Sequence, residues 1–263
     1  MHYDDIVANI NEFNKAYNDY IETLRARSDK KKLEEFSKMR GFSMETIEKT
    51  GIFYVGDAVE MLLPKYLEMV EAFGVISPTN KKPIYHDRYV IPIKDVNGDM
   101  LNVVGYSKEA DERYVYGTAL YYRRRDDLWG LENLHKAYEV GYGILTEGIT
   151  DAIALRDIGY DVSFANCGTH SAPVAMNQFN RCRYGIIKFG DRDKAGELAQ
   201  KRWQCHRYIT LNTFVEYKDA DEMIHKAENG VEWVKSYIDD CIGWLKQKEH
   251  KGFDCERPVV TMY

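Results

Sequence analysis

Two short apolar runs, each ending in acidic residues, dominate the central part of the chain. Residues 143–146 run into Glu147 and Gly148, and residues 186–190 run into Asp191-Arg192-Asp193. A helical pattern continues from the first acidic residue to Ile158, and a third apolar run covers 208–215. Parallel strands joined by helices end at the same edge of a sheet, so this pattern predicts an α/β fold in which the acidic residues meet.

The flanking segments show other periodicities. In residues 1–40, apolar side chains recur every three or four positions, which predicts helix, and Ser43 has the character of a helix N-cap. Short β-prone runs then follow, with a hairpin signal at Asn97-Gly98 between the first two; they cover 89–93, 100–106 and 113–116. Helical spacing returns from Val231 to Leu245 and is followed by a polar tail.

The acidic residues are candidates for a metal site. Carboxylates that cluster repel one another, and a bound divalent cation relieves that repulsion. Mg²⁺ prefers oxygen ligands and is commonly held by one or two carboxylates together with waters and phosphates. Each motif alone is equally consistent with an ordinary turn or a solvated loop. The combination is more specific, because Asp219-Ala220-Asp221 after the third apolar run repeats the same layout.

These residues resemble the Toprim domain of bacterial DnaG-type primases. The resemblance is carried by three central segments, namely Glu147 to Asp151, Asn166 to Thr169, and Asp191 to Gly196. It extends upstream and downstream over roughly residues 40 to 225, through segments 88–98, 128–131 and 219–224. This breadth favours a primase over other Toprim proteins.

The resemblance implies an α/β fold with a Toprim-type, mainly parallel sheet flanked by helices, preceded by a mixed α+β basic subdomain and followed by a short helical tail. The implied divisions are a helical extension (1–40), an N-terminal α+β subdomain of the primase core (41–140), the Toprim domain (141–217) and a helical C-terminal segment (218–263). Zinc-binding and helicase-binding domains are expected to be absent. Such a compact version suggests a phage or mobile-element replication system.

The implied activity is the synthesis of short RNA primers from ribonucleoside triphosphates on a single-stranded DNA template. Two or more Mg²⁺ or Mn²⁺ ions would be held by Glu147, Asp191 and Asp193, the catalytic set, with Asp219 and Asp221 beside them. The residues implied to frame the site or to bind template or nucleotide phosphates are Arg88, Arg113, Arg124, Asp151 and Gly168. A replicative helicase is the expected protein partner.

The sequence departs from the family pattern at several points. Arg192 stands where glycine is common between the two aspartates, Ile149-Thr150 replaces a more aromatic pair, and Ala220 replaces proline. None of these changes removes a carboxylate. The side chain of Arg192 must point away from the metal or contact phosphate itself.

Composition and charge limit the other possibilities. The formal net charge is −6, yet residues 181–207 hold eight basic and three acidic residues, and Arg123-Arg124-Arg125 lies among aromatic residues. Basic residues interleaved with aromatic rings suit single-stranded nucleic acid, although an exposed loop beside core aromatics has the same pattern. The five cysteines have neither zinc-ligand nor disulfide spacing, so no zinc is expected.

Neither a membrane-spanning run nor a secretory signal is recognisable, which predicts a cytoplasmic protein of a bacterium or a phage-infected host, with no membrane partner.

Two alternatives to a primase stay open. A Toprim nuclease would use the same carboxylates to activate water, and a non-catalytic accessory protein would bind nucleic acid or a helicase.

Overall fold

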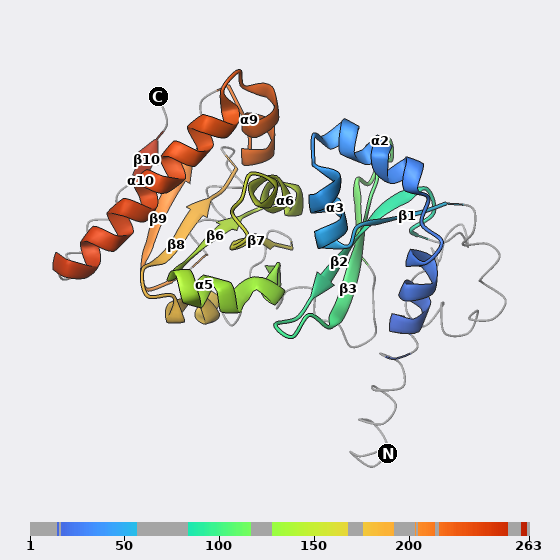
Figure 1. Cartoon of the computed structure of the whole chain (residues 1–263), viewed down its shortest axis with the longest axis horizontal. Coiled ribbons are helices and arrows are strands. Elements are labelled where there is room, and N and C mark those ends of the chain that lie inside the picture. Colours follow the sequence, from blue (N-terminus) through green and yellow to red (C-terminus); the bar gives the residue numbers. More distant parts are fainter. Residues whose placement is uncertain are drawn as a thin grey trace, which may run out of the picture. The chain divides into compact units, whose positions relative to one another are not determined.

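The computed structural model describes residues 15, 17–56, 84–116, 128–167, 176–191, 203, 205–213, 216–251 and 259–261 (Figure 1). The chain forms two compact units. Unit 1 comprises residues 1–93 and 99–122, and unit 2 comprises residues 94–98 and 123–263. The division of the chain into four parts expected from the family resemblance stays a prediction.

Unit 1 is built on a sheet of order β1-β2-β3-β4. Its strands are β1 (Phe53–Val55), β2 (Arg88–Lys94), β3 (Met100–Tyr106) and β4 (Tyr114–Tyr116). The predicted hairpin at Asn97-Gly98 is confirmed, because Gly98 adopts φ +88° in the turn between β2 and β3. A glycine accepts this left-handed conformation without a Cβ clash.

Helices cover this sheet, as the spacing of apolar residues predicts. Residues 17–25 are helical, and Tyr17, Ile21 and Leu24 are buried in the core with strand residues of β1, β2 and β3. Helices α2 (Lys30–Arg40) and α3 (Met44–Thr50) follow. The predicted N-cap of α3 is confirmed, since Ser43 Oγ accepts a hydrogen bond from the Thr46 amide at 3.1 Å.

Unit 2 contains a six-stranded sheet of order β10-β9-β8-β6-β7-β5. The strands are β5 (Leu128–Trp129), β6 (Tyr142–Thr146), β7 (Ser163–Asn166), β8 (Gly185–Phe189), β9 (Tyr208–Asn212) and β10 (Val259–Thr261). Within the described residues, β5 pairs with β7 antiparallel and the other neighbours pair in parallel. The prediction of an α/β fold is therefore confirmed, with parallel and antiparallel pairings in the molecule.

The helical elements of unit 2 lie between and beside these strands. They are η1 (Leu131–Asn133), α5 (Leu134–Val140), α6 (Ile149–Asp157), η2 (Gln178–Arg181), α9 (Ala220–Lys226) and α10 (Gly230–Lys251). Helix α10 packs along β8 and β9, α6 packs along β6 and β7, and α9 contacts both helices (Figure 1). No helix in the described part of the chain is long and apolar enough to span a membrane.

One buried ion pair fastens α6 to the β5 edge of the sheet. Arg156 Nη1 lies 2.7 Å from Glu132 Oε1, and the Arg156 side chain is 8% exposed. The same guanidinium donates to the carbonyls of Ser163 and Gly130 and stacks 4.1 Å from the centre of the Trp129 ring. The Arg156 side chain therefore connects its own helix α6 with the end of β5, with η1 and with β7.

The end of the chain differs from the expected polar tail. Strand β10 pairs in parallel with β9, in the register Val260 with Leu211. The outer edge of β9 presents backbone groups that need partners, and the β-branched residues at 259–261 suit a strand.

Candidate active site

The strand order places the two main acidic motifs beside each other. Thr146, the last residue of β6, pairs with Phe189, the last residue of β8, so Glu147 and Asp191 follow adjacent strand ends at one edge. From β6 the chain continues to β7 on one side, whereas β8 is followed by β9 on the other side. In open α/β sheets, ligands bind outside the carboxyl ends of the strands at such a reversal of strand order.

Asp151 lies in the first turn of α6 and is 5% exposed. Its Oδ1 accepts a hydrogen bond of 2.9 Å from the backbone amide of Asp221, which joins the start of α6 to the start of α9. A Cβ atom on Gly148 would lie 2.5 Å from Asp151 Oδ2. Glycine is therefore needed after Glu147 to leave room for this buried carboxylate.

The segment that enters α9 adds further charged groups. Asp219 is the N-cap of α9, and its Oδ1 accepts from the Glu222 amide at 2.8 Å. The ammonium of Lys218 lies 2.9 Å from Asp191 Oδ2. His225 Nδ1 lies 3.0 Å from Asp221 Oδ1, one helical turn along α9. Strand β8 and helix α9 are thus linked by an ion pair at this edge.

The pKa values show that these carboxylates affect one another. Burial, followed by the negative charges of Asp219 and Asp191, raises the pKa of Asp151 well above its usual range. Burial also raises the pKa of Asp219, with smaller contributions from Asp191 and Asp221 that the Glu222 amide and Lys218 oppose. Since the negative charge is concentrated in poorly solvated space, a cation placed here would be stabilised.

Comparisons with known proteins identify the fold. No protein-family model matches the chain. The DNA primase of Thermotoga maritima is 24% identical over 285 residues, covering 92% of this chain and 50% of the relative, and that of Haemophilus influenzae is 27% identical over 183 residues, covering 64% and 30%. A structure of the DnaG primase catalytic domain bound to single-stranded DNA superposes with a TM-score of 0.73 at 16% identity, covering 94% of this chain and 85% of that domain.

The chain has the fold of a DnaG-type primase catalytic core. It spans about half the length of the Thermotoga primase and less of the Haemophilus protein. Within this primase fold, the carboxyl edge described above is the candidate active site, and its residues Glu147, Asp151, Asp191, Asp219 and Asp221 all belong to unit 2.

The donor set suits a hard divalent cation, because the acidic side chains offer carboxylate oxygens. Among the described residues, no three His, Cys, Asp or Glu side chains are grouped tightly enough to hold a metal ion. Asp193 lies outside the described residues. The Lys218 ammonium already lies against Asp191, so a metal ion bound by that carboxylate would compete with an internal cation.

The predicted basic residues of the primase fold can be located in part. Arg88 begins β2 in unit 1, and its Nη1 donates to the carbonyl oxygens of Glu112 at 2.9 Å and Arg113 at 3.4 Å. Burial lowers the pKa of Arg88 from its ordinary value. The Arg113 side chain is exposed beside it. Arg124 and Gly168 lie outside the described residues.

Sequence reasoning missed two residues of this site. Lys218 immediately precedes Asp219, and its ion pair with Asp191 joins segments that are distant in sequence. His225 follows Asp221 by four positions, a spacing that places two helical side chains on one face. The second contact has a signal in the sequence, whereas the first follows only from the pairing of β8 with β9.

Proposed function

We propose that this chain is a DNA primase catalytic core, which synthesises short RNA primers from ribonucleoside triphosphates on single-stranded DNA by metal-dependent nucleotidyl transfer. The observation that carries the proposal is the pairing of Thr146 with Phe189, which brings the ends of β6 and β8, after which Glu147 and Asp191 follow, to one edge of the sheet. Support comes from the likeness to a DnaG catalytic domain whose structure contains single-stranded DNA.

In this proposal, Glu147, Asp191 and Asp193 hold Mg²⁺ or Mn²⁺, with two or more ions at the edge and Asp219 and Asp221 beside them. When bound, such ions would supply Lewis-acid stabilisation of the triphosphate and would lower the pKa of the primer 3′-hydroxyl. The catalytic side chains act by holding and orienting, and a protein nucleophile is not required.

Other residues of the chain shape this chemistry. The hydrogen bond from the Asp221 amide fixes the Asp151 carboxylate, which frames this edge from the first turn of α6. The Lys218 ammonium, which lies 2.9 Å from Asp191 Oδ2, would compete with a metal ion for that carboxylate and could instead contact a phosphate oxygen. Arg88, Arg113 and Arg124 would contact template or triphosphate, and Gly168 would let backbone amides approach phosphate.

Primer synthesis is the direct test. Purified chain is incubated with single-stranded DNA, labelled ribonucleoside triphosphates and Mg²⁺ or Mn²⁺, with and without a replicative helicase. Oligoribonucleotides are expected, and helicase should increase their yield. Degraded template instead of product would favour the Toprim nuclease, and the absence of both would favour an accessory protein.

Variants make the test residue-specific. Asp191→Asn should abolish synthesis while single-stranded DNA binding stays within about twofold, since the change removes a metal ligand and leaves the basic surface intact. Lys235→Gln is the control, because Lys235 is an exposed cation on α10. Primer synthesis by the Asp191 variant at the unmodified rate would refute the assignment of the catalytic set.

Binding of Mn²⁺ near Asp191 can be measured separately from primer synthesis. Replacing Lys218 by Met removes the internal cation from Asp191; the Lys218 side chain is largely exposed although Asp191 is not, and an ion pair that reaches solvent contributes up to about 1 kcal/mol. We therefore expect Mn²⁺ to bind up to about fivefold more tightly to Lys218→Met, as measured by calorimetry. Unchanged Mn²⁺ affinity of this variant would show that Asp191 is not a ligand of the ion, and weaker binding would show that Lys218 supports the ion indirectly.

A further inference from the structure

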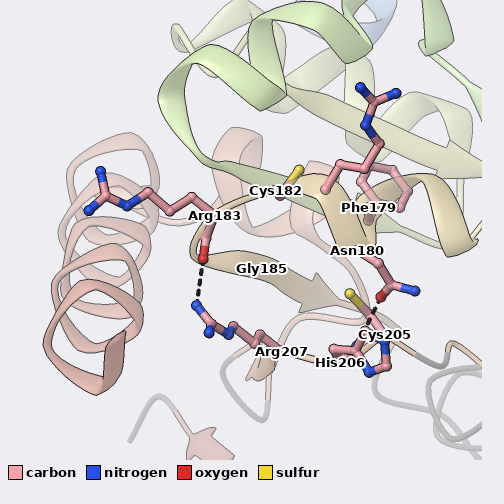
Figure 2. A pocket seen from close by; sticks show the side chains of 9 residues that line it. Phe179, Asn180, Cys182, Arg183, Gly185, Cys205, His206 and Arg207 are labelled. Carbon is pink, nitrogen blue, oxygen red and sulfur yellow. Dashed lines mark hydrogen bonds between the residues drawn. The ribbon is translucent and has the colours of Figure 1, made fainter. Parts of the chain in front are cut away.

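A second pocket lies at the other edge of the unit 2 sheet, where β8 and β9 begin. Its volume is about 350 Å³. It is lined by residues 179–183, Gly185 and residues 205–207 (Figure 2). Gly185 is the first residue of β8, whereas Asp191 follows the end of that strand. At about 3.3 Å per strand residue, the pocket lies roughly 20 Å from the carboxylate edge.

Hydrogen bonds between the two wall segments hold the pocket open. Asn180 Oδ1 accepts from the His206 amide at 3.0 Å, and Arg207 Nη1 donates to the Arg183 carbonyl at 2.7 Å; dashed lines in Figure 2 mark both contacts. The Arg207 carbonyl accepts from the Ile186 amide at 3.0 Å. Two of these contacts use a side chain and one is a strand-edge backbone contact, and together they hold the two wall segments beside each other.

Gly185 makes this close approach possible. It has φ +104°, and a Cβ atom there would lie 2.3 Å from the carbonyl oxygen of Arg207. A larger residue would have to push the 205–207 segment away from β8, which would open the pocket. The geometry of the walls therefore depends on a position that only glycine can fill without strain.

The residues of the lining that carry a permanent charge are all positive. Arg181, Arg183 and Arg207 are among the lining residues, and neither Asp nor Glu occurs among these described lining residues; the Arg183 side chain extends away from the cavity (Figure 2). Burial raises the pKa of the Cys182 thiol to about 12 and also raises that of Cys205, so both thiols are neutral at pH 7. The basic excess of residues 181–207 in the sequence is therefore partly gathered around one cavity.

Aromatic rings stack on the guanidinium groups of two of these arginines. Arg181 stacks 4.9 Å from the centre of the Tyr138 ring, and Arg183 lies 5.4 Å from that of Tyr184. Stacking on a ring reduces the motion of the guanidinium while its charge is kept. Preorganised guanidinium groups beside a cavity are the usual device for recognising phosphate.

We propose that this pocket binds a phosphate group, carried either by a free nucleotide or pyrophosphate or by a nucleic-acid strand. The volume lies within the range of small-molecule sites, which leaves room for an organic group beside the phosphate. The site is separate from the proposed catalytic edge and requires no metal ion, so its occupancy and primer synthesis can be tested independently.

Calorimetric titration with pyrophosphate in EDTA tests the pocket, since metal-dependent binding at the carboxylate edge is then silent. We expect one saturable site in about 50 mM salt, where the charge interaction is weakly screened. Arg207→Gln and Arg181→Gln should each weaken binding at least fivefold. The charge-matched control Lys235→Gln, on α10, should leave the Kd within twofold.

Cys205 gives a local readout, because it lines the pocket and is only partly buried. Alkylation of the native protein is followed by peptide mass spectrometry, which separates Cys205 from the other four cysteines. Pyrophosphate or AMP should slow Cys205 alkylation at least threefold. Protection by a 5′-phosphorylated oligonucleotide at lower concentration than AMP would identify a nucleic-acid strand as the source of the phosphate.

Loss of pyrophosphate binding in an arginine variant can be distinguished from loss of folding. Thermal melting monitors each variant, and Arg181→Gln leaves all three frame hydrogen bonds intact if Arg207→Gln is unstable. Protection of Cys205 is measured in the unmodified chain. Unchanged Cys205 alkylation in the presence of every phosphate probe, or pyrophosphate affinities equal in all variants, would overturn the proposal.

Discussion

Arg156 offers the sharpest test of what stabilises unit 2. Replacement by Met keeps an apolar stem of similar length but removes the guanidinium. Glu132 then loses its partner at 2.7 Å, the Ser163 and Gly130 carbonyls lose their donors, and the Trp129 ring loses the stacked cation. We expect a large loss of stability confined to unit 2.

The magnitude follows from burial. Removing one partner of a buried, hydrogen-bonded ion pair costs about 3–5 kcal/mol. Glu132 is 24% exposed, so water solvates part of the remaining charge, and an estimate of about 2–4 kcal/mol is more suitable. With a urea dependence of about 2 kcal/mol per molar, the unfolding midpoint should fall by about 1–2 M.

Tryptophan fluorescence measures this unit separately, because all four tryptophans of the chain lie in residues 123–263. Lys235→Met, an exposed change on α10, should shift the unfolding free energy by less than about 0.5 kcal/mol. Glu132→Gln completes a double-mutant cycle that isolates the ion pair. A loss below about 1 kcal/mol for Arg156→Met, with unchanged urea dependence, would refute the reasoning.

Three further predictions concern the two edges of the sheet. Gly148→Ala should destabilise unit 2 by about 1–2 kcal/mol, because its Cβ displaces the Asp151 carboxylate. The control Gly243→Ala meets no atom within 4 Å and should stabilise α10 by up to about 1 kcal/mol; equal effects in urea unfolding would contradict this. Asp151 has a raised pKa in the folded state, so its contribution to stability is greatest below its usual pKa of 3.8 and is lost as pH rises through the raised value. Asp151→Asn should therefore be more stable than the unmodified chain at pH 7, with the difference disappearing towards pH 3, and a pH-independent difference would disprove the titration. Gly185→Ala should cost about 2–4 kcal/mol through strain and the clash with Arg207, and it should abolish Cys205 protection by pyrophosphate; intact protection would show that Gly185 does not shape the pocket.

Local signals in the sequence predicted much of the fold. The apolar runs before Glu147 and Asp191 become β6 and β8, the Asn97-Gly98 turn joins β2 and β3, and Ser43 caps α3. These features depend on side-chain periodicity and turn chemistry within a few residues, so a single sequence contains the information. The α/β fold class followed from them.

Contacts between distant segments were not predictable in the same way. Nothing near Arg156 in the sequence indicates that it will pair with Glu132, and Lys218 meets Asp191 only after β8 and β9 have paired. Strand β10 was missed because its three residues are too few for a periodic signal. The roles of all the predicted site residues stay predictions, and Asp193, Arg124 and Gly168 also lie outside the described part of the chain.

The parallel pairing of β10 with β9 has a consequence for how the protein is made. During synthesis, β9 keeps an open flank until residue 261 has left the ribosome, long after the rest of the sheet is available to fold. An unpaired strand flank can recruit a strand from another nascent chain. Disruption of β10, for example by Val260→Pro, should therefore increase aggregation far more than the small contact area of this strand suggests.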